Sequence, residues 1–269
     1  MPFYSFATGG GGANQALDNT YDTQGLDADG AGTAVTADAS VNVLGTPVAI
    51  YTAPADLSGF YVWVRATSVN PRYQFSVRAG ATTYIVNDFY VTPGTTSGIQ
   101  RVFFPLNVAS GTVLYVAQRS STASAVLHVA ITGEHRNSQS PPRWTSLETI
   151  HVDTSNTRAG SVTVTADDGW DPLIDPTAQA YGGLMYSVGV TSTNPAGTPI
   201  AVSIGIGAAA SEAAIFEQPF ILNTASPQSP AGNGALIEKI IPVSSRLSGR
   251  IKSATNTDTA YIALYGLVA

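Results

Sequence analysis

Short runs of alternating apolar and polar residues recur along most of the chain. Residues 60–65 (Phe-Tyr-Val-Trp-Val-Arg) and 73–78 (Tyr-Gln-Phe-Ser-Val-Arg) are typical, and both are rich in aromatic and β-branched side chains. A period of two predicts half-buried β-strands. Further strands are predicted at residues 47–51, 83–86, 100–104, 112–117, 125–131, 149–152, 161–165, 184–190, 199–206, 213–216, 235–241, 246–252 and 259–265. Short strands spaced roughly ten residues apart, with few helix signals, predict an all-β fold of antiparallel, jelly-roll-like sandwiches.

The strand pattern occurs twice. The segment Gly59–Pro71 reappears 124 positions later as Gly183–Pro195, and Val129–Gly133 reappears 133 positions later as Ile262–Gly266. The offset grows because the second copy carries extra residues, most of them between positions 217 and 236. A period this long predicts an internal duplication of a whole domain. Two copies of one unit favour a building block that presents surface over a single catalytic cleft, so the sequence predicts a protein that is not an enzyme.

Composition divides the chain into four parts. Residues 1–38 are predicted to be an N-terminal anchoring arm, because an aromatic patch is followed by four glycines and by polar turn residues. Residues 39–134 form the first predicted sandwich and residues 145–269 the second. The polar, Pro-Pro-containing stretch 135–144 is the predicted linker. The aromatic side chains of the arm, Phe3, Tyr4 and Phe6, are predicted to bind a partner.

Charge is sparse and unevenly distributed. Charged residues make up 11% of the chain, where about 25% is usual. The first 64 residues contain six aspartates and no Lys or Arg, which equals the whole net charge of −6. An acidic front end on a neutral body disfavours nucleic acid and could dock on a basic protein surface. The aspartates also suit turn positions, so both interpretations stand.

The chain shows no sign of export or of a disulfide framework. It contains no cysteine. No positively charged n-region precedes an apolar stretch, and no run approaches 18 apolar residues. We expect a protein that is made in a cytoplasm without a signal peptide and that has no membrane partner.

Two motifs resemble ligand sites. The segment 205–210 has the spacing Gly-x-Gly-x-x-Ala of a dinucleotide fingerprint, but Pro219 follows early and no acid lies about 20 residues on, so a glycine-bearing strand end is preferred. Two acidic stretches provide weak calcium candidates without the closing Glu of a calcium loop, and Asx turns explain them as well. These candidates are Asp27, Asp29, Asp167, Asp168 and Asp171. The sequence predicts no cofactor.

Catalytic constellations are weak. The three histidines, His128, His135 and His151, lack the His-x-x-x-His spacing of a zinc site, and no Gly-x-Ser-x-Gly elbow occurs. Paired carboxylates for glycoside cleavage remain open, but nothing in the sequence singles out a pair. Candidate acids are Asp88, Asp168, Asp171, Asp175, Glu212 and Glu217.

The two copies differ within the strand at residues 60–65. In the second copy the corresponding positions alternate between large apolar residues (Leu184, Tyr186) and Met185, Ser187 and Gly189. Because Ser and Gly suit the outer face, Tyr61 and Trp63 are predicted to point outward. An exposed Tyr-Trp pair predicts a binding patch or a subunit contact. The alternative is that the aromatic residues fill the sandwich core.

The segments 202–212, 241–242 and 261–266 resemble those of accessory virion proteins of tailed bacteriophages, which decorate capsids or build head spikes, tail fibres and tail appendages. The resemblance implies β-sandwiches that form homo-oligomers, often trimers, bound to capsid or tail proteins, with no catalytic residues. It implies that the protein works in the virion. It therefore predicts a non-enzymatic virion structural protein docked through its arm. The alternative is a receptor- or carbohydrate-binding adhesin that recognises a host surface glycan, and an enzyme acting on polysaccharide is a third interpretation.

Overall fold

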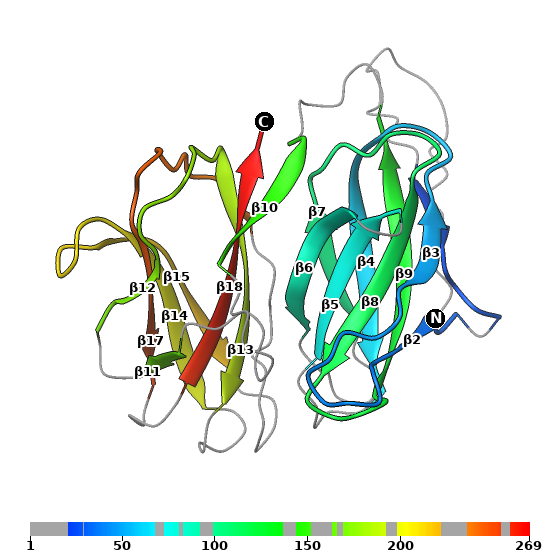
Figure 1. The fold of residues 1–269 in the computed structure, drawn as a ribbon, viewed down its shortest axis with the longest axis horizontal. Helices are drawn as coiled ribbons and strands as arrows, with labels where there is room; N and C mark the ends of the chain where they lie inside the picture. The colour runs from blue at the N-terminus through cyan, green and yellow to red at the C-terminus, as the bar shows by residue number, and fades with distance from the viewer. Residues whose placement is uncertain are drawn as a thin grey trace, which may run out of the picture.

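A computed structural model describes residues 21–28, 30–67, 73–80, 83–91, 99–136, 144–151, 163–165, 169–191, 198–221, 236–253 and 259–269. Within these residues the chain forms strands and turns and no helix, so no helix long and apolar enough to cross a membrane occurs there. The all-β prediction is confirmed (Figure 1).

The first nine strands form one sandwich. They are β1 (Tyr21–Gln24), β2 (Thr33–Thr36), β3 (Val48–Thr52), β4 (Leu57–Ala66), β5 (Tyr73–Ala79), β6 (Thr83–Val91), β7 (Gln100–Phe104), β8 (Val113–Ser120) and β9 (Val126–His135). One sheet has the order β1-β9-β4-β7, with β2 also paired to β9, and the other has the order β3-β8-β5-β6. All of these pairs are antiparallel.

The next nine strands repeat this arrangement. They are β10 (Ser146–His151), β11 (Thr163–Thr165), β12 (Asp171–Ile174), β13 (Gly183–Thr191), β14 (Pro199–Ile206), β15 (Ala213–Ile221), β16 (Leu236–Ile237), β17 (Leu247–Lys252) and β18 (Thr259–Val268). Their sheets have the orders β10-β18-β13-β16, with β11 on β18, and β12-β17-β14-β15. Each strand is the counterpart of the one nine places earlier, so the predicted duplication into two tandem sandwiches is confirmed.

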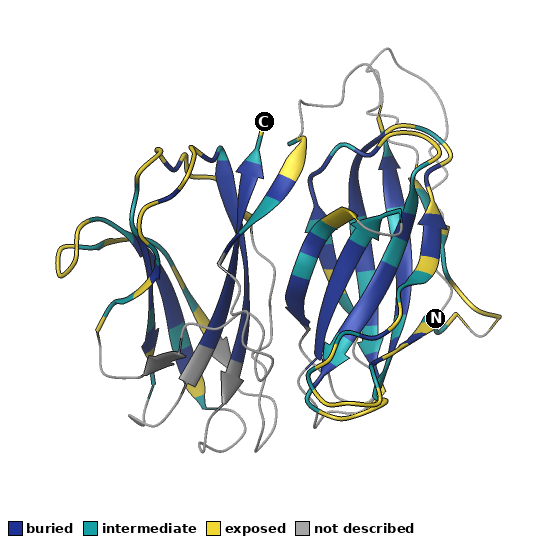
Figure 2. Cartoon of the chain, in the orientation of Figure 1, coloured by how far each residue is buried: buried dark blue, intermediate teal, exposed yellow. Residues whose placement is uncertain are grey.

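Each core forms because alternate side chains of a strand point to one face. In β4, Phe60, Val62 and Val64 are fully buried, while the residues between them are only partly covered. The rings of Phe60, Phe75, Phe89 and Phe104 meet inside the first sandwich at centroid distances of 5.3 to 6.3 Å. Figure 2 shows the buried residues concentrated on the strands of both sandwiches.

The first core continues into a contact between the two sandwiches. The Phe89 ring on β6 stacks on Tyr265 of β18, with centroids 5.8 Å apart. The Tyr90 amide donates to Ser187 Oγ (3.1 Å), and the Tyr265 hydroxyl donates to the carbonyl oxygen of Asn87 (2.7 Å). The outer face of the β10-β18-β13-β16 sheet is therefore covered by the first sandwich.

Strands β1 and β2 lie within residues 1–38, the segment expected to be an anchoring arm. Tyr21–Gln24 and Thr33–Thr36 instead pair with β9 as part of the first sheet. The polar and glycine residues around these strands suggested turns, but backbone pairing with β9 and the burial of Val35 hold them in the sandwich. The part of the predicted arm that remains, residues 1–20, lies outside the described residues.

Candidate functional site

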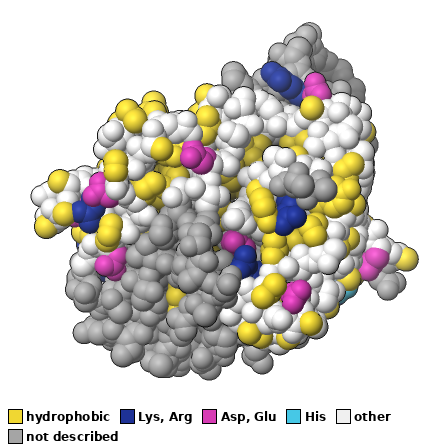
Figure 3. All heavy atoms as spheres, viewed as in Figure 1, with side chains coloured by type: hydrophobic (Ala, Val, Ile, Leu, Met, Phe, Trp, Pro, Cys, Tyr) yellow, Lys and Arg dark blue, Asp and Glu magenta, His cyan; other side chains and the backbone are white. Residues whose placement is uncertain are grey.

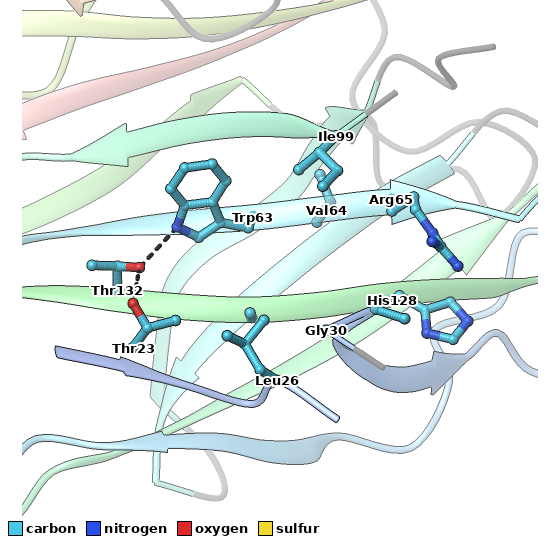
Figure 4. A pocket seen from close by; sticks show the side chains of 11 residues that line it. Thr23, Leu26, Gly30, Trp63, Val64, Arg65, Ile99, His128 and Thr132 are labelled. Atoms are coloured by element: carbon cyan, nitrogen blue, oxygen red, sulfur yellow. Dashed lines mark hydrogen bonds between the residues drawn. The ribbon is translucent and has the colours of Figure 1, made fainter. Parts of the chain in front are cut away.

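A pocket of about 250 Å³ opens on the outer face of the β1-β9-β4-β7 sheet. Its floor comes from β4 and β9, and the turn between β1 and β2 forms one wall (Figure 4). The larger side chains that line it are those of Leu26, Trp63, Arg65, Ile99, His128 and Thr132. The register of β4 and β9 brings several of these residues together. Arg65 lies opposite His128, two residues from the Trp63–Ala130 pair.

One end of the pocket carries a chain of hydrogen bonds. The Trp63 indole Nε1 donates to Thr132 Oγ1 at 2.9 Å, and that oxygen lies 2.7 Å from Thr23 Oγ1 on β1. The indole hydrogen bond fixes the orientation of the ring. The two hydroxyl groups can donate to or accept from a ligand at this end.

The other end carries two nitrogen-bearing side chains. His128 Nδ1 lies 3.0 Å from the Gly32 carbonyl oxygen, which can only accept, so Nδ1 carries a proton and Nε2 is left for other contacts. Gly32 adopts a φ of +96°, and a Cβ atom there would lie 3.0 Å from the Val129 backbone nitrogen, so the position favours glycine. Arg65 forms no ion pair with any described carboxylate.

Apolar side chains surround the middle of the pocket. Leu26 and Ile99 are 45% and 52% exposed at its rim. The Arg101 guanidinium lies 5.3 Å from the Trp63 ring centre and 4.8 Å from that of Tyr61. Charged side chains are sparse on the face of the molecule shown in Figure 3.

The structure places Tyr61 and Trp63 on the outer face of β4, where the sequence predicted them. Only Trp63 reaches the pocket. Tyr61 packs instead against Phe103 on β7, with ring centroids 4.6 Å apart. The pocket also contains Arg65, His128 and Thr132, which the sequence did not group, because the pairing of β4 with β9 joins residues more than 60 positions apart.

The second copy has no equivalent of this pocket within the described residues. Ser187 takes the place of Trp63 there, and Tyr90 of the first sandwich packs over it. A Cβ atom at Gly189 would lie 2.9 Å from the Tyr90 ring, so the small residues of β13 make room for that ring. The same sheet face is thus open in the first sandwich and covered in the second.

The predicted metal candidates do not come together among the described residues. Asp27 caps the turn between β1 and β2, because its Oδ1 accepts from the Ala31 amide at 2.6 Å. Asp171 lies in β12, paired with Gly249. No group of three His, Asp or Glu side chains suited to a metal occurs in the described part of the chain. Asp29, Asp167 and Asp168 lie outside the described residues, as do Phe3, Tyr4 and Phe6.

His135 belongs to a separate cluster at the edge of the first sandwich. Asp22 Oδ1 lies 2.6 Å from His135 Nε2 and accepts from the Tyr51 hydroxyl at 2.5 Å. Burial, and then the neighbouring Asp22 carboxylate, raise the pKa of Tyr51. The cluster ties β1 to β3 and β9, so we assign it a structural role.

The candidate acids among the described residues also lie apart from the pocket. Asp88 is buried in an ion pair with Arg119 (3.1 Å), and burial outweighs the arginine, so its pKa is raised. Glu217 is exposed on β15, where a hydrogen bond from Ser203 and then the Lys252 ammonium lower its pKa. No described carboxylate lines the pocket.

No protein-family model and no curated protein matches the sequence. Solved structures of similar fold include PNGF-II, at 10% identity and a TM-score of 0.48. The alignment covers 93% of this chain and 65% of PNGF-II. PNGase F from Flavobacterium meningosepticum is similar at 10% identity and a TM-score of 0.47, over 92% of this chain and 94% of that one. A tandem CBM22 domain from Paenibacillus barcinonensis Xyn10C aligns at 12% identity and a TM-score of 0.27, over 94% and 92% of the two chains. Identities and TM-scores at this level concern the fold alone.

These comparisons correct the expectation that the chain is not an enzyme. A glycosylasparaginase and an asparagine amidase align with 92% and 87% of this chain, at TM-scores of 0.47 and 0.42. The duplication therefore does not exclude an enzyme.

Viral proteins also occur among the structures of similar fold. A chain of Sulfolobus Turreted Icosahedral Virus aligns at 11% identity and a TM-score of 0.36, over 91% of this chain and 90% of that one. No sequence match supports the more specific resemblance to a bacteriophage accessory protein.

Proposed function

We propose that this protein binds glycans, and that the pocket around Trp63 is the binding site. The observation that carries the proposal is a partly buried indole, held in place by Thr132, at the wall of a pocket that has polar groups at both ends. Aromatic rings pack on the apolar faces of sugar rings, while hydroxyl and charged groups fix their orientation. Ligand pockets commonly measure about 300–1,000 Å³, so about 250 Å³ suits one sugar unit rather than a long chain.

The similar solved structures include a peptide-N(4)-(N-acetyl-β-D-glucosaminyl) asparagine amidase and a tandem CBM22 domain. Those likenesses supply the fold and do not carry the proposal. The pocket is built from residues of this chain alone.

A glycan array probed with the full chain tests the proposal. Trp63→Ala should lower binding to the recognised glycan at least about tenfold, because the stacking surface is lost. Trp170→Ala is the matched control, since Trp170 also carries a guanidinium over its ring, that of Arg250 at 4.4 Å, but belongs to the second sandwich. Equal binding by the Trp63→Ala variant and the parent chain would rule out this site.

We further propose a setting for this binding, namely the surface of a virus particle to which residues 1–20 attach the protein as a homo-oligomer. The support comes from the sequence: the aromatic residues Phe3, Tyr4 and Phe6, the absence of cysteine and the resemblance described above. A chain lacking residues 1–20 should stay folded but lose docking on particles. If it still docks, the anchor is elsewhere.

A further inference from the structure

The two ends of the pocket differ in their chemistry. The Thr23 and Thr132 hydroxyls lie at one end, the Trp63 ring and Leu26 flank the middle, and Arg65 and His128 lie at the other end (Figure 4). A ligand that uses the whole pocket therefore presents hydroxyl groups at one end and a complementary charge at the other.

The far end of the pocket is basic, with the Arg65 guanidinium as its cation. Arg65 and His128 face each other across β4 and β9, and no described carboxylate lines the pocket. Asp27, the neighbour of the lining residue Leu26, accepts a hydrogen bond from the Ala31 amide. A guanidinium presents paired N–H donors in a plane, which match the two oxygens of a carboxylate.

We propose that the site prefers a sugar that carries a carboxylate, the class to which hexuronic acids belong. The carboxylate binds Arg65, with His128 beside it. The sugar ring packs against Trp63, and ring hydroxyls reach Thr23 and Thr132. This inference rests on the proposed function, because it specifies the ligand class of the same pocket.

A pair of ligands that differ in one group tests the inference. The full chain is titrated with methyl β-glucuronide and with methyl β-glucoside, followed by amide chemical shifts. The glucuronide should bind at least about tenfold more tightly, and raising the salt concentration should reduce that difference. Glucose 6-sulfate is the third ligand, and tighter binding of this sulfate than of the glucuronide would overturn the assignment to carboxylates.

Variants locate the charge recognition. Arg65→Gln should bring the two affinities to within about threefold of each other, and Arg65→Lys should restore part of the difference, because it keeps the charge without the planar fork. Arg250→Gln is the matched control on the other sandwich and should change neither affinity. Thermal melting of each variant separates loss of recognition from loss of fold.

The results distinguish this inference from the proposed function. Equal binding of both sugars, abolished by Trp63→Ala but not by Arg65→Gln, would overturn the preference for a carboxylate and leave glycan binding intact. Failure of every ligand on the array and in the titrations would overturn both.

Discussion

The indole of Trp63 is held on two sides. Its Nε1 donates to Thr132 Oγ1, and the Arg101 guanidinium lies near its face. The alternation of β4 turns the ring outward. A ring that is already oriented loses little conformational freedom when a ligand arrives, which favours binding.

Thr132→Val tests this orientation. The variant removes the Thr132 acceptor of the indole N–H, so the free energy of unfolding should fall by about 1 kcal/mol. Binding should weaken as well, because the ring is less constrained. Urea denaturation and the glucuronide titration measure the two effects. Unchanged values for both would show that the Thr132 hydrogen bond does not position the ring.

Buried tyrosines make the fold sensitive to alkali. Burial, and then the Glu148 carboxylate, raise the pKa of Tyr181 from 10.0 to about 12, and the pKa of Tyr51 is also raised. A pKa that is higher in the folded state contributes stability that is present below pH 10 and is lost as the pH rises toward about 12.

We therefore expect unfolding between about pH 10 and 12, with the buried tyrosines ionising as the fold is lost. Tyrosinate absorbance and circular dichroism recorded on the same samples check this. Full tyrosine ionisation in a chain that keeps its strand signal would contradict it.

At the scale of elements, the contact of β6 with β13 depends on small residues. Gly189→Ala should lower the free energy of unfolding by about 1–3 kcal/mol, because the added Cβ atom would lie 2.9 Å from the Tyr90 ring. A Tyr90→Ala background should remove most of this effect, which a double-mutant cycle in urea measures. Additive losses would show that the two residues are not coupled.

Strands β1 and β2 allow a test of where the first sandwich begins. Deletion of residues 1–38 removes both strands and the Thr23 side of the pocket, so the melting temperature should fall by more than about 5 °C. Deletion of residues 1–20 keeps every described strand and should change it little. Equal melting of the two truncated chains would show that β1 and β2 do not stabilise the sandwich.

The sequence predicts most strands and the duplication, because alternation and repeated segments are local signals. It did not predict β1 and β2, which are only four residues long, lie among turn residues and pair with a strand about 100 positions away. It also did not predict that Ser187 and Gly189 lie under the first sandwich, because a covered outer face and an exposed one both accept small residues. The sequence predicted only part of the pocket. Trp63 could be placed on the outer face, but the residues beside it depend on the register of β4 and β9.

At the scale of the whole molecule, two copies of one sandwich have taken different roles. The face that carries Trp63 in the first copy is open, while its counterpart in the second copy packs against β6 through Ser187 and Tyr265. Duplication followed by packing of one copy on the other leaves a single open face of this type in the described structure. That asymmetry is why we place the ligand site on the first sandwich.

The most direct test uses the three tryptophans of the chain as reporters. Indole N–H signals of ¹⁵N-labelled protein are assigned with single Trp→Phe variants and followed during titration with the recognised glycan. We predict a saturable shift of the Trp63 signal, with those of Trp144 and Trp170 unmoved. A bound glycan that leaves Trp63 unmoved, or that shifts Trp170 instead, would contradict the account.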